Sequence, residues 1–309
     1  MQRRAHPARR SAVLAAMAAT AILVSACGAG AATPSGSGGG GGGGGIGHPT
    51  GAQPVFAITY AGGMIANGHL TTLPGFWMTG DGLVVMPGAM IDIFPGPLMP
   101  PLNARRLTEE GVQTVLGAIA ASKQFSANAE WRGAQNFVAD AGDTILTLHA
   151  EDREVKITVF ALGWFTPDQV PPNVAPAEVA AHVALNTLVN RLTTLDQWLP
   201  ASAWAESGWQ PYKPAALRLL VRNADADPPD DTGIGETLID WPTDDDPATF
   251  GEETVLGERC GVVTGEAAQK WLTSLEPANQ LSRWLKGEHR YAVTPRPLLP
   301  GEAENCPAG

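Results

Sequence analysis

The residues that could carry out catalysis are few in this chain and stand apart from one another. After position 53 the histidines are isolated, at His69, His149, His182 and His289. No HExxH, Walker loop, CxxC pair or GxSxG turn accompanies them, so a Ser-His-Asp triad would have to assemble without a local signature. Glu178, His182 and Asn186 follow one another at i, i+4 spacing, which could form half of a metal site. Because no second histidine and carboxylate pair completes it, a solvated helix face is the favoured interpretation.

Cys27 has the most informative surroundings of any residue in the chain. It follows Ser25 and Ala26 at the end of an apolar run over residues 12–24, and arginines precede that run at positions 3, 4, 9 and 10. The run is too short to span a bilayer, and the pattern is typical of a secretory signal. Small residues before a cysteine resemble a bacterial lipobox, in which the thiol is acylated and the signal is removed. The alternative is cleavage after Ala31, which would discard Cys27.

A glycine-rich segment follows Cys27 and cannot bury enough apolar surface to become ordered. The sequence therefore predicts a signal peptide over residues 1–26, an acylated cysteine with a flexible tether over 27–53, and an extracytoplasmic body over 54–309. Two acyl chains such as palmitate would hold that body stably on the outward-facing side of the cell membrane.

The composition is that of a globular body with an acidic surface. The chain has 20 basic and 31 acidic residues, a formal charge of −11, and without the four signal arginines it has 16 and 31, a charge of −15. Nucleic acid and anionic lipid surfaces are bound through Lys and Arg, so the charge argues against both. No cofactor motif is present, and no cofactor is predicted.

Cys260 and Cys306 remain as an even pair once Cys27 is acylated. In a compartment that permits disulfides, we predict that they are bonded. Free thiols and a metal pair are the alternatives, although two distant cysteines without a nearby histidine make a poor zinc site.

Acidic residues crowd the segment between Arg222 and Arg259, which contains no basic residue. Carboxylates are the ligands that calcium prefers, and Asp244, Asp245 and Asp246 are the candidates within this segment. The prolines at 228 and 229 break the EF-hand pattern. A solvated acidic loop is therefore favoured over a calcium site.

Aromatic residues gather in the stretch that follows the longest predicted helix. Trp204, Trp209 and Tyr212, with Trp198 before them, could stack on sugars or extended peptides if they are exposed. Aromatics in a long connection more commonly pack the loop onto the body. Exposure of the patch would favour a binding site.

Hairpins with scattered helices are expected to position these residues. Strands are predicted over residues 55–60, 76–78, 83–86, 91–94, 134–139, 144–149, 155–162, 217–222 and 290–294. Three helices are predicted: one begins at the cap Thr108, one runs over residues 176–199, and one begins at the cap Thr264. Asp81-Gly82 marks a tight turn. Without regular alternation of strands and helices, the pattern favours an α+β fold, with antiparallel hairpins and three main helices in a single compact body.

Several short motifs resemble those of uncharacterised lipoproteins of high-GC bacteria. They are Thr79-Gly80-Asp81-Gly82, Phe94-Pro95-Gly96-Pro97, Leu107-Thr108-Glu109-Glu110-Gly111, and Arg296-Pro297-Leu298-Leu299-Pro300-Gly301-Glu302 before Cys306. The resemblance covers nearly the whole body and implies the same localisation. The family has no assigned activity, so no catalytic residue is transferred.

Together these features favour a lipid-anchored extracytoplasmic binding or interaction protein over an enzyme. The expected partners are the membrane, through the anchor, and an envelope protein or a glycan. The alternative is a cell-envelope hydrolase or another enzyme without a recognisable motif. An enzyme would place His149 or His289 in a concave pocket beside a nucleophile or carboxylate, whereas a binding protein would expose Trp204 and Trp209 around a groove.

Overall fold

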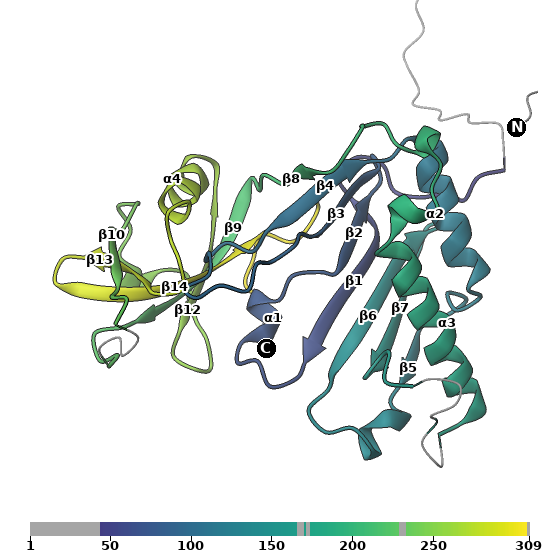
Figure 1. Cartoon of the computed structure of the whole chain (residues 1–309), viewed down its shortest axis with the longest axis horizontal. Coiled ribbons are helices and arrows are strands. Elements are labelled where there is room, and N and C mark those ends of the chain that lie inside the picture. The colour runs from purple at the N-terminus through teal and green to yellow at the C-terminus, as the bar shows by residue number, and fades with distance from the viewer. Residues whose placement is uncertain (1–43, 166–169, 171–173, 229–232, 308–309) are drawn as a thin grey trace, which may run out of the picture. The chain divides into compact units, whose positions relative to one another are not determined.

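The computed structural model describes residues 44–165, 170, 174–228 and 233–307. These residues form a single body of mixed sheets and helices, which confirms the predicted α+β class (Figure 1). The predicted signal, Cys27 and most of the predicted tether lie outside the described residues. Within the described ranges, no helix combines the length and the apolar character that crossing a membrane requires.

The larger sheet has eight strands. The two neighbouring strands at one edge are parallel, and all other neighbouring pairs are antiparallel. In order across the sheet the strands are β5 (Ala129–Trp131), β7 (Arg153–Phe160), β6 (Gly142–Ala150), β1 (Pro54–Gly62), β2 (Phe76–Thr79), β3 (Leu83–Pro87), β4 (Leu102–Arg106) and β8 (Gln210–Pro211). Ile58 of β1 lies opposite Leu146 on one side and Phe76 on the other. Apolar side chains at alternate positions thus cover one face of the sheet.

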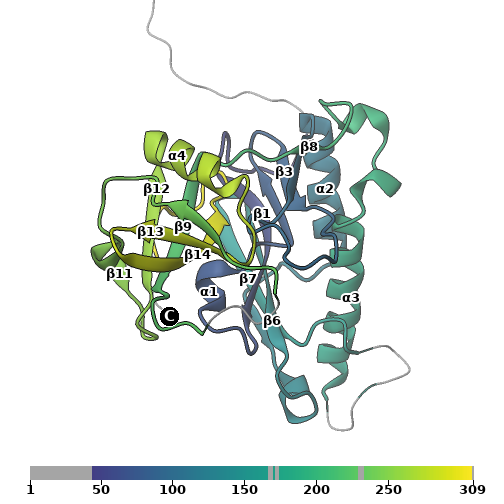
Figure 2. The ribbon, with the colours of Figure 1, turned by 60° about the vertical axis from the view of Figure 1, so that its left-hand side comes forward.

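Two helices, α2 (Glu109–Ala121) and α3 (Pro176–Leu192), cover that face (Figures 1 and 2). Val112, Val115, Leu116 and Ile119 of α2 are buried against the sheet, as their helical spacing predicts. Thr108 caps α2 as predicted, because its hydroxyl accepts a hydrogen bond from the Gly111 amide. The opposite face of the sheet carries a smaller cluster: Ala57, Trp77, Val85, Leu102 and Leu299.

The second sheet has six strands, with α4 (Gly265–Leu275) packed on it. In order its strands are β10 (Thr237–Asp240), β13 (Ser282–Lys286), β14 (His289–Pro297), β9 (Ala216–Asn223), β12 (Arg259–Thr264) and β11 (Glu252–Glu253). Trp271 and Trp284 are fully buried in its core. Thr264 precedes α4 at the predicted cap position, but its side chain makes no capping hydrogen bond.

Short elements complete the described body. The helix α1 (Gly68–Thr71) contacts β1 of the larger sheet and β9 and β14 of the smaller one. The 3₁₀ turns are η1 (Gly133–Asn136), η2 (Leu195–Gln197), η3 (Ala201–Ala203) and η4 (Pro247–Thr249).

The predicted β2–β3 hairpin is confirmed. Gly82 lies in its turn with φ of 80°, and a side chain at this position would meet the carbonyl of Leu107. Glycine is therefore required there both for its backbone conformation and for the close approach.

Three element predictions are wrong. Residues 91–94 form no strand, because their large side chains point mostly into solvent and no neighbouring strand pairs with them. Residues 134–139 contain η1 instead of a strand, and the third strand beside β6 and β7 is β5. The helix predicted over residues 176–199 ends at Leu192, where the Thr193 and Thr194 hydroxyls bond to carbonyls of the last turn.

The described body includes residues 44–53, which precede the start expected at Pro54. Ile46 packs against the main core, and the Gly80 and Asp81 amides donate hydrogen bonds to the carbonyls of Gln53 and Gly51. The last residues of the predicted tether are therefore part of the body.

Candidate functional site

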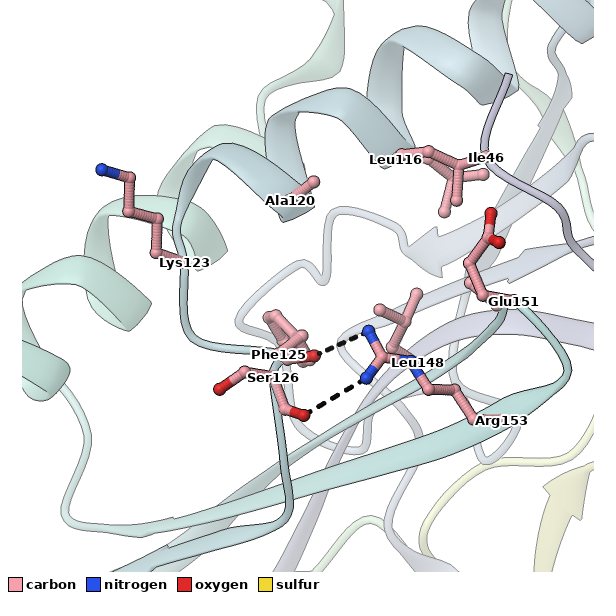
Figure 3. A pocket seen from close by; sticks show the side chains of 10 residues that line it. Ile46, Leu116, Ala120, Lys123, Phe125, Ser126, Leu148, Glu151 and Arg153 are labelled. Atoms are coloured by element: carbon pink, nitrogen blue, oxygen red, sulfur yellow. Dashed lines mark hydrogen bonds between the residues drawn. The ribbon is translucent and has the colours of Figure 1, made fainter. Parts of the chain in front are cut away.

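A cavity of about 510 Å³ lies at the end of the larger sheet where β6 turns into β7 (Figure 3). We call it the α2 cavity. Its lining comes from the N-terminal segment, α2, the loop after α2, and the β6–β7 hairpin. The lining residues are Ile46, Leu116, Ala120, Lys123, Phe125, Ser126, Leu148, Ala150, Glu151 and Arg153.

Apolar side chains form most of the wall of the α2 cavity. Leu116 and Phe125 are anchored in the main core, where the Phe125 ring packs edge-on against Phe56 with centroids 5.6 Å apart. Leu148 and Ala150 lie on the core face of β6. Because alanines occupy two wall positions, at 120 and 150, the wall leaves space that larger side chains would fill.

Two cations border the cavity, and neither forms an ion pair with a carboxylate of the described residues. Lys123 is exposed at the end of α2, where φ of 58° turns the chain towards Phe125. The Arg153 guanidinium donates to the carbonyls of Ser126 and Phe125, at 3.2 and 3.5 Å (Figure 3). These contacts hold the guanidinium beside the cavity without neutralising its charge.

An N-terminal strap, residues 44–53, forms one side of the cavity through Ile46. The Gln113 side chain of α2 both accepts from the Ile46 amide at 2.8 Å and donates to the Ile46 carbonyl at 3.0 Å. The Gly47 amide donates to Glu151 at 2.6 Å, and the Glu151 amide donates to the Gly47 carbonyl at 2.8 Å. Glu151 is thus held by the strap without losing its charge, so the lining carries two cations, Lys123 and Arg153, and one carboxylate.

His48 continues the strap onto the first turn of α2. Its Nδ1 lies 2.7 Å from the Pro49 carbonyl, and its Nε2 lies 3.2 Å from Glu109. A hydrogen bond from the Gln113 amide, with the contact from His48, lowers the pKa of Glu109 below its ordinary value. The strap is therefore fixed to α2 at both Gln113 and Glu109.

The aromatic residues singled out in the sequence do not form an exposed platform. Trp204 is buried under the guanidinium of Arg105, 3.9 Å above its ring, and Trp209 packs edge-on against it with centroids 5.6 Å apart. The half-buried Trp209 donates its indole N–H to Asp196, which also pairs with Arg105. The connection is packed onto the body, which is the alternative interpretation of these aromatics.

Tyr212 is half-buried and serves the same connection. Its hydroxyl donates to the Leu298 carbonyl at 3.0 Å. Burial, with a smaller contribution from Glu302, raises the pKa of Tyr212 to about 12. The phenol therefore stays protonated and is already engaged within the body.

The calcium candidates are not brought together. Asp244, Asp245 and Asp246 are exposed, and the Asp246 carboxylate accepts from the Ala248 amide, where it caps η4. Across the described ranges, no three histidine, cysteine, aspartate or glutamate side chains cluster as metal ligands would.

Other carboxylates of the acidic segment are not simply solvated, contrary to the favoured interpretation. Arginines of the neighbouring strands β9, β13 and β14 bind them, although the segment itself has none. The ion pairs are Asp227 with Arg222 and Arg283, Glu236 with Arg283 and Arg290, and Asp225 with His289. The Arg290 amide and His289 lower the pKa of Asp225 to about 2.

His149 and His289 each lie near a carboxylate. His149 lines a hollow of about 400 Å³ together with His48, and its Nδ1 is 3.6 Å from Glu154. No serine, threonine or cysteine is among the lining residues of that hollow. His289 is exposed at the acidic segment, 2.6 Å from Asp225.

The predicted solvated face at Glu178 and His182 is wrong. Both residues are buried, and the His182 ring packs on Phe165 with centroids 4.6 Å apart. Glu178 accepts from the Gly133 amide and lies 3.8 Å from His182, but no metal-ligand group forms there among the described residues. The hydrophobic cluster around Phe165 covers this helix face, which helical spacing alone could not indicate.

The Cys260–Cys306 disulfide is confirmed. The two Cα atoms are 6.0 Å apart, and the bond joins β12 to the C-terminal segment across 46 positions of sequence.

None of the residues that line the α2 cavity was predicted from the sequence to be a functional residue. Lys123 and Arg153 lie thirty positions apart, Arg153 within the charged run Glu151-Asp152-Arg153-Glu154 of a hairpin turn, and the alanines that leave the space are ordinary in a helix and a strand. The sequence offers one weak signal for this site: Ile46 is an apolar residue directly after the glycine-rich run, and such a residue indicates where the chain packs onto a core.

No protein-family model, curated protein or solved structure matches this chain.

Proposed function

We propose that this protein is a lipid-anchored, outward-facing binding protein whose ligand is a small amphiphile with an anionic head group. The α2 cavity is the observation that supports this function. Its volume of about 510 Å³ lies in the range of small-molecule sites, and its apolar wall with few polar groups is typical of them.

The charges around the cavity indicate which end of a ligand lies where. The body carries a large excess of acidic residues, yet two of the three charged residues that line this cavity are the cations Lys123 and Arg153, against the single carboxylate of Glu151. A carboxylate or phosphate at the border would receive hydrogen bonds from both, and Arg153 is held in position by two carbonyls. An alkyl chain would then lie along Leu116, Phe125 and Leu148.

Binding of saturated alkyl carboxylates of increasing chain length tests this function. The protein is the chain from position 27 onward with Cys27→Ser, so that no detergent competes for the cavity. Each added methylene contributes up to about 0.8 kcal/mol, so calorimetry should show affinity rising up to about fourfold per methylene until the cavity is full. The carboxylate should bind about fivefold tighter than the alcohol of equal length.

Three variants make the test specific. Ala120→Trp fills the cavity from an exposed helix position and should abolish binding of every chain length. Ala121→Trp, on the same helix but outside the lining, is its control. Arg153→Gln should remove the preference for carboxylate over alcohol, whereas Lys156→Gln, exposed on the same strand, should leave it unchanged. Affinity independent of chain length, or binding that survives Ala120→Trp, would exclude the cavity as the site.

The lipid anchor is the second part of the proposal and rests on the sequence around Cys27. In the bacterial envelope, the wild-type chain should incorporate palmitate and fractionate with membranes, and Cys27→Ser should remove both properties. A Cys260→Ala/Cys306→Ala variant should keep the label, because its Cys27 is intact. A mature N-terminus after Ala31, found by mass spectrometry, would show cleavage of an ordinary signal instead.

A further inference from the structure

A second hollow, of about 430 Å³, lies at the other end of the β6–β7 hairpin from the α2 cavity. No residue lines both. The hollow borders the start of β6 and the cavity its end, so along a nine-residue strand the two are about 25 Å apart. We call it the Tyr60–Trp164 hollow after its two aromatic residues.

The walls of the hollow are exposed aromatic and apolar side chains. Trp164 is 64% exposed and Tyr60 43%, whereas the other described tryptophans are buried or half-buried. Met64 and Ile65 extend the apolar rim. The Tyr60 hydroxyl end lies over Gly75, where any side chain would collide with it, and it makes no hydrogen bond with the described residues.

Polar groups lie between these walls. Gly62, Gly63 and Gly142 line the hollow without side chains, so backbone borders it directly. Asp140 is exposed and forms no ion pair or hydrogen bond among the described residues, whereas Asp143 is held by two bonds to Arg132 at 3.0 Å each. The hollow therefore combines aromatic faces with an uncompensated carboxylate.

We infer that the Tyr60–Trp164 hollow binds a neutral saccharide. The C–H faces of a sugar ring pack against aromatic faces, and its hydroxyls donate to a carboxylate such as Asp140. An apolar protein or lipid surface would cover the Asp140 carboxylate without giving it a hydrogen bond, which is costly. An acidic sugar would be repelled, because the available charge in the hollow is negative.

Titration of the chain from position 27 onward, carrying Cys27→Ser, with neutral gluco-, manno- and galacto-oligosaccharides tests this inference. Binding should protect Trp164 from acrylamide quenching, since its indole is the most accessible in the described body. Calorimetry should show Trp164→Ala weakening the affinity about tenfold and Asp140→Asn about fivefold. Asparagine tolerates the positive φ of 63° at position 140, so the second variant changes charge with little change in shape.

Controls separate this site from other surfaces and from the α2 cavity. Phe94→Ala removes an exposed ring that does not line the hollow and should leave saccharide binding unchanged. Ala120→Trp should also leave it unchanged, so failure of the amphiphile proposal would not affect this result. Absence of binding by all three sugar classes at millimolar concentration, or binding unaffected by Trp164→Ala, would overturn the inference.

Discussion

His182 is a buried base whose two ring nitrogens lack hydrogen-bond partners in the described body. Burial lowers its pKa below the ordinary value, although Glu178 opposes the shift. The unfolded chain therefore binds a proton at His182 more readily than the folded body does. The free energy of unfolding is at its full value above about pH 6.5 and decreases as the pH falls below that value. The loss should not exceed about 1.4 kcal/mol per pH unit.

Urea unfolding of wild type and His182→Phe between pH 7.5 and 5 measures this effect. The variant should lose the acid-dependent component, because its ring cannot be protonated. His289→Gln is the control: Asp225 raises the pKa of His289, so that residue stabilises at low pH and its removal should not relieve the acid loss. Parallel pH profiles for wild type and His182→Phe would contradict the burial argument.

Single residues could be predicted from the sequence where local chemistry decides their role. Thr108 is a cap, Gly82 a turn residue and Cys260 half of a disulfide for reasons that lie within a few positions or in the cysteine count. Arg153 and Trp164 could not be recognised, because their roles depend on segments that tertiary packing brings beside them.

Helices and strands could be predicted where apolar residues repeat at regular spacing over enough positions. The hairpins β2–β3 and β6–β7 and the helices α2 and α4 follow their patterns. The three-residue strand β5 carries too few residues for a period, and only its pairing with β7 defines it. The apolar run at residues 91–94 has strand composition, yet composition cannot supply a neighbouring strand.

The N-terminal strap shows that the position of an element boundary determines whether the α2 cavity is complete. Its glycine-rich composition predicts a free chain, but Gln113 bonds to both backbone groups of Ile46 and thereby closes one side of the α2 cavity. That pairing joins positions 67 apart in sequence. A body truncated at Pro54, as the sequence suggested, would lack this wall.

The whole described body depends on pairing between strands that are far apart in sequence. In the smaller sheet, β14 near the C-terminal end lies between its sequence neighbour β13 and the distant strand β9. The sequence predicted the α+β class but not this order, since strand pairing at such separations leaves no local pattern. The disulfide fixes the same region. It joins Cys260 of β12 to Cys306, so the chain between them, which includes α4 and β14, forms a covalent loop.

Removing this bond should destabilise the body without changing its fold. For a separation of 46 positions, the chain-entropy model gives about 4 kcal/mol, because the cross-link restricts the unfolded chain. In a body of this size, Cys260→Ala/Cys306→Ala should therefore lower the melting temperature by about 10 °C in calorimetry. Cys27→Ser should leave the melting temperature unchanged. A loss below about 1 kcal/mol would mean that the sheet pairing of β14 alone already orders this region, and that the disulfide adds little to it.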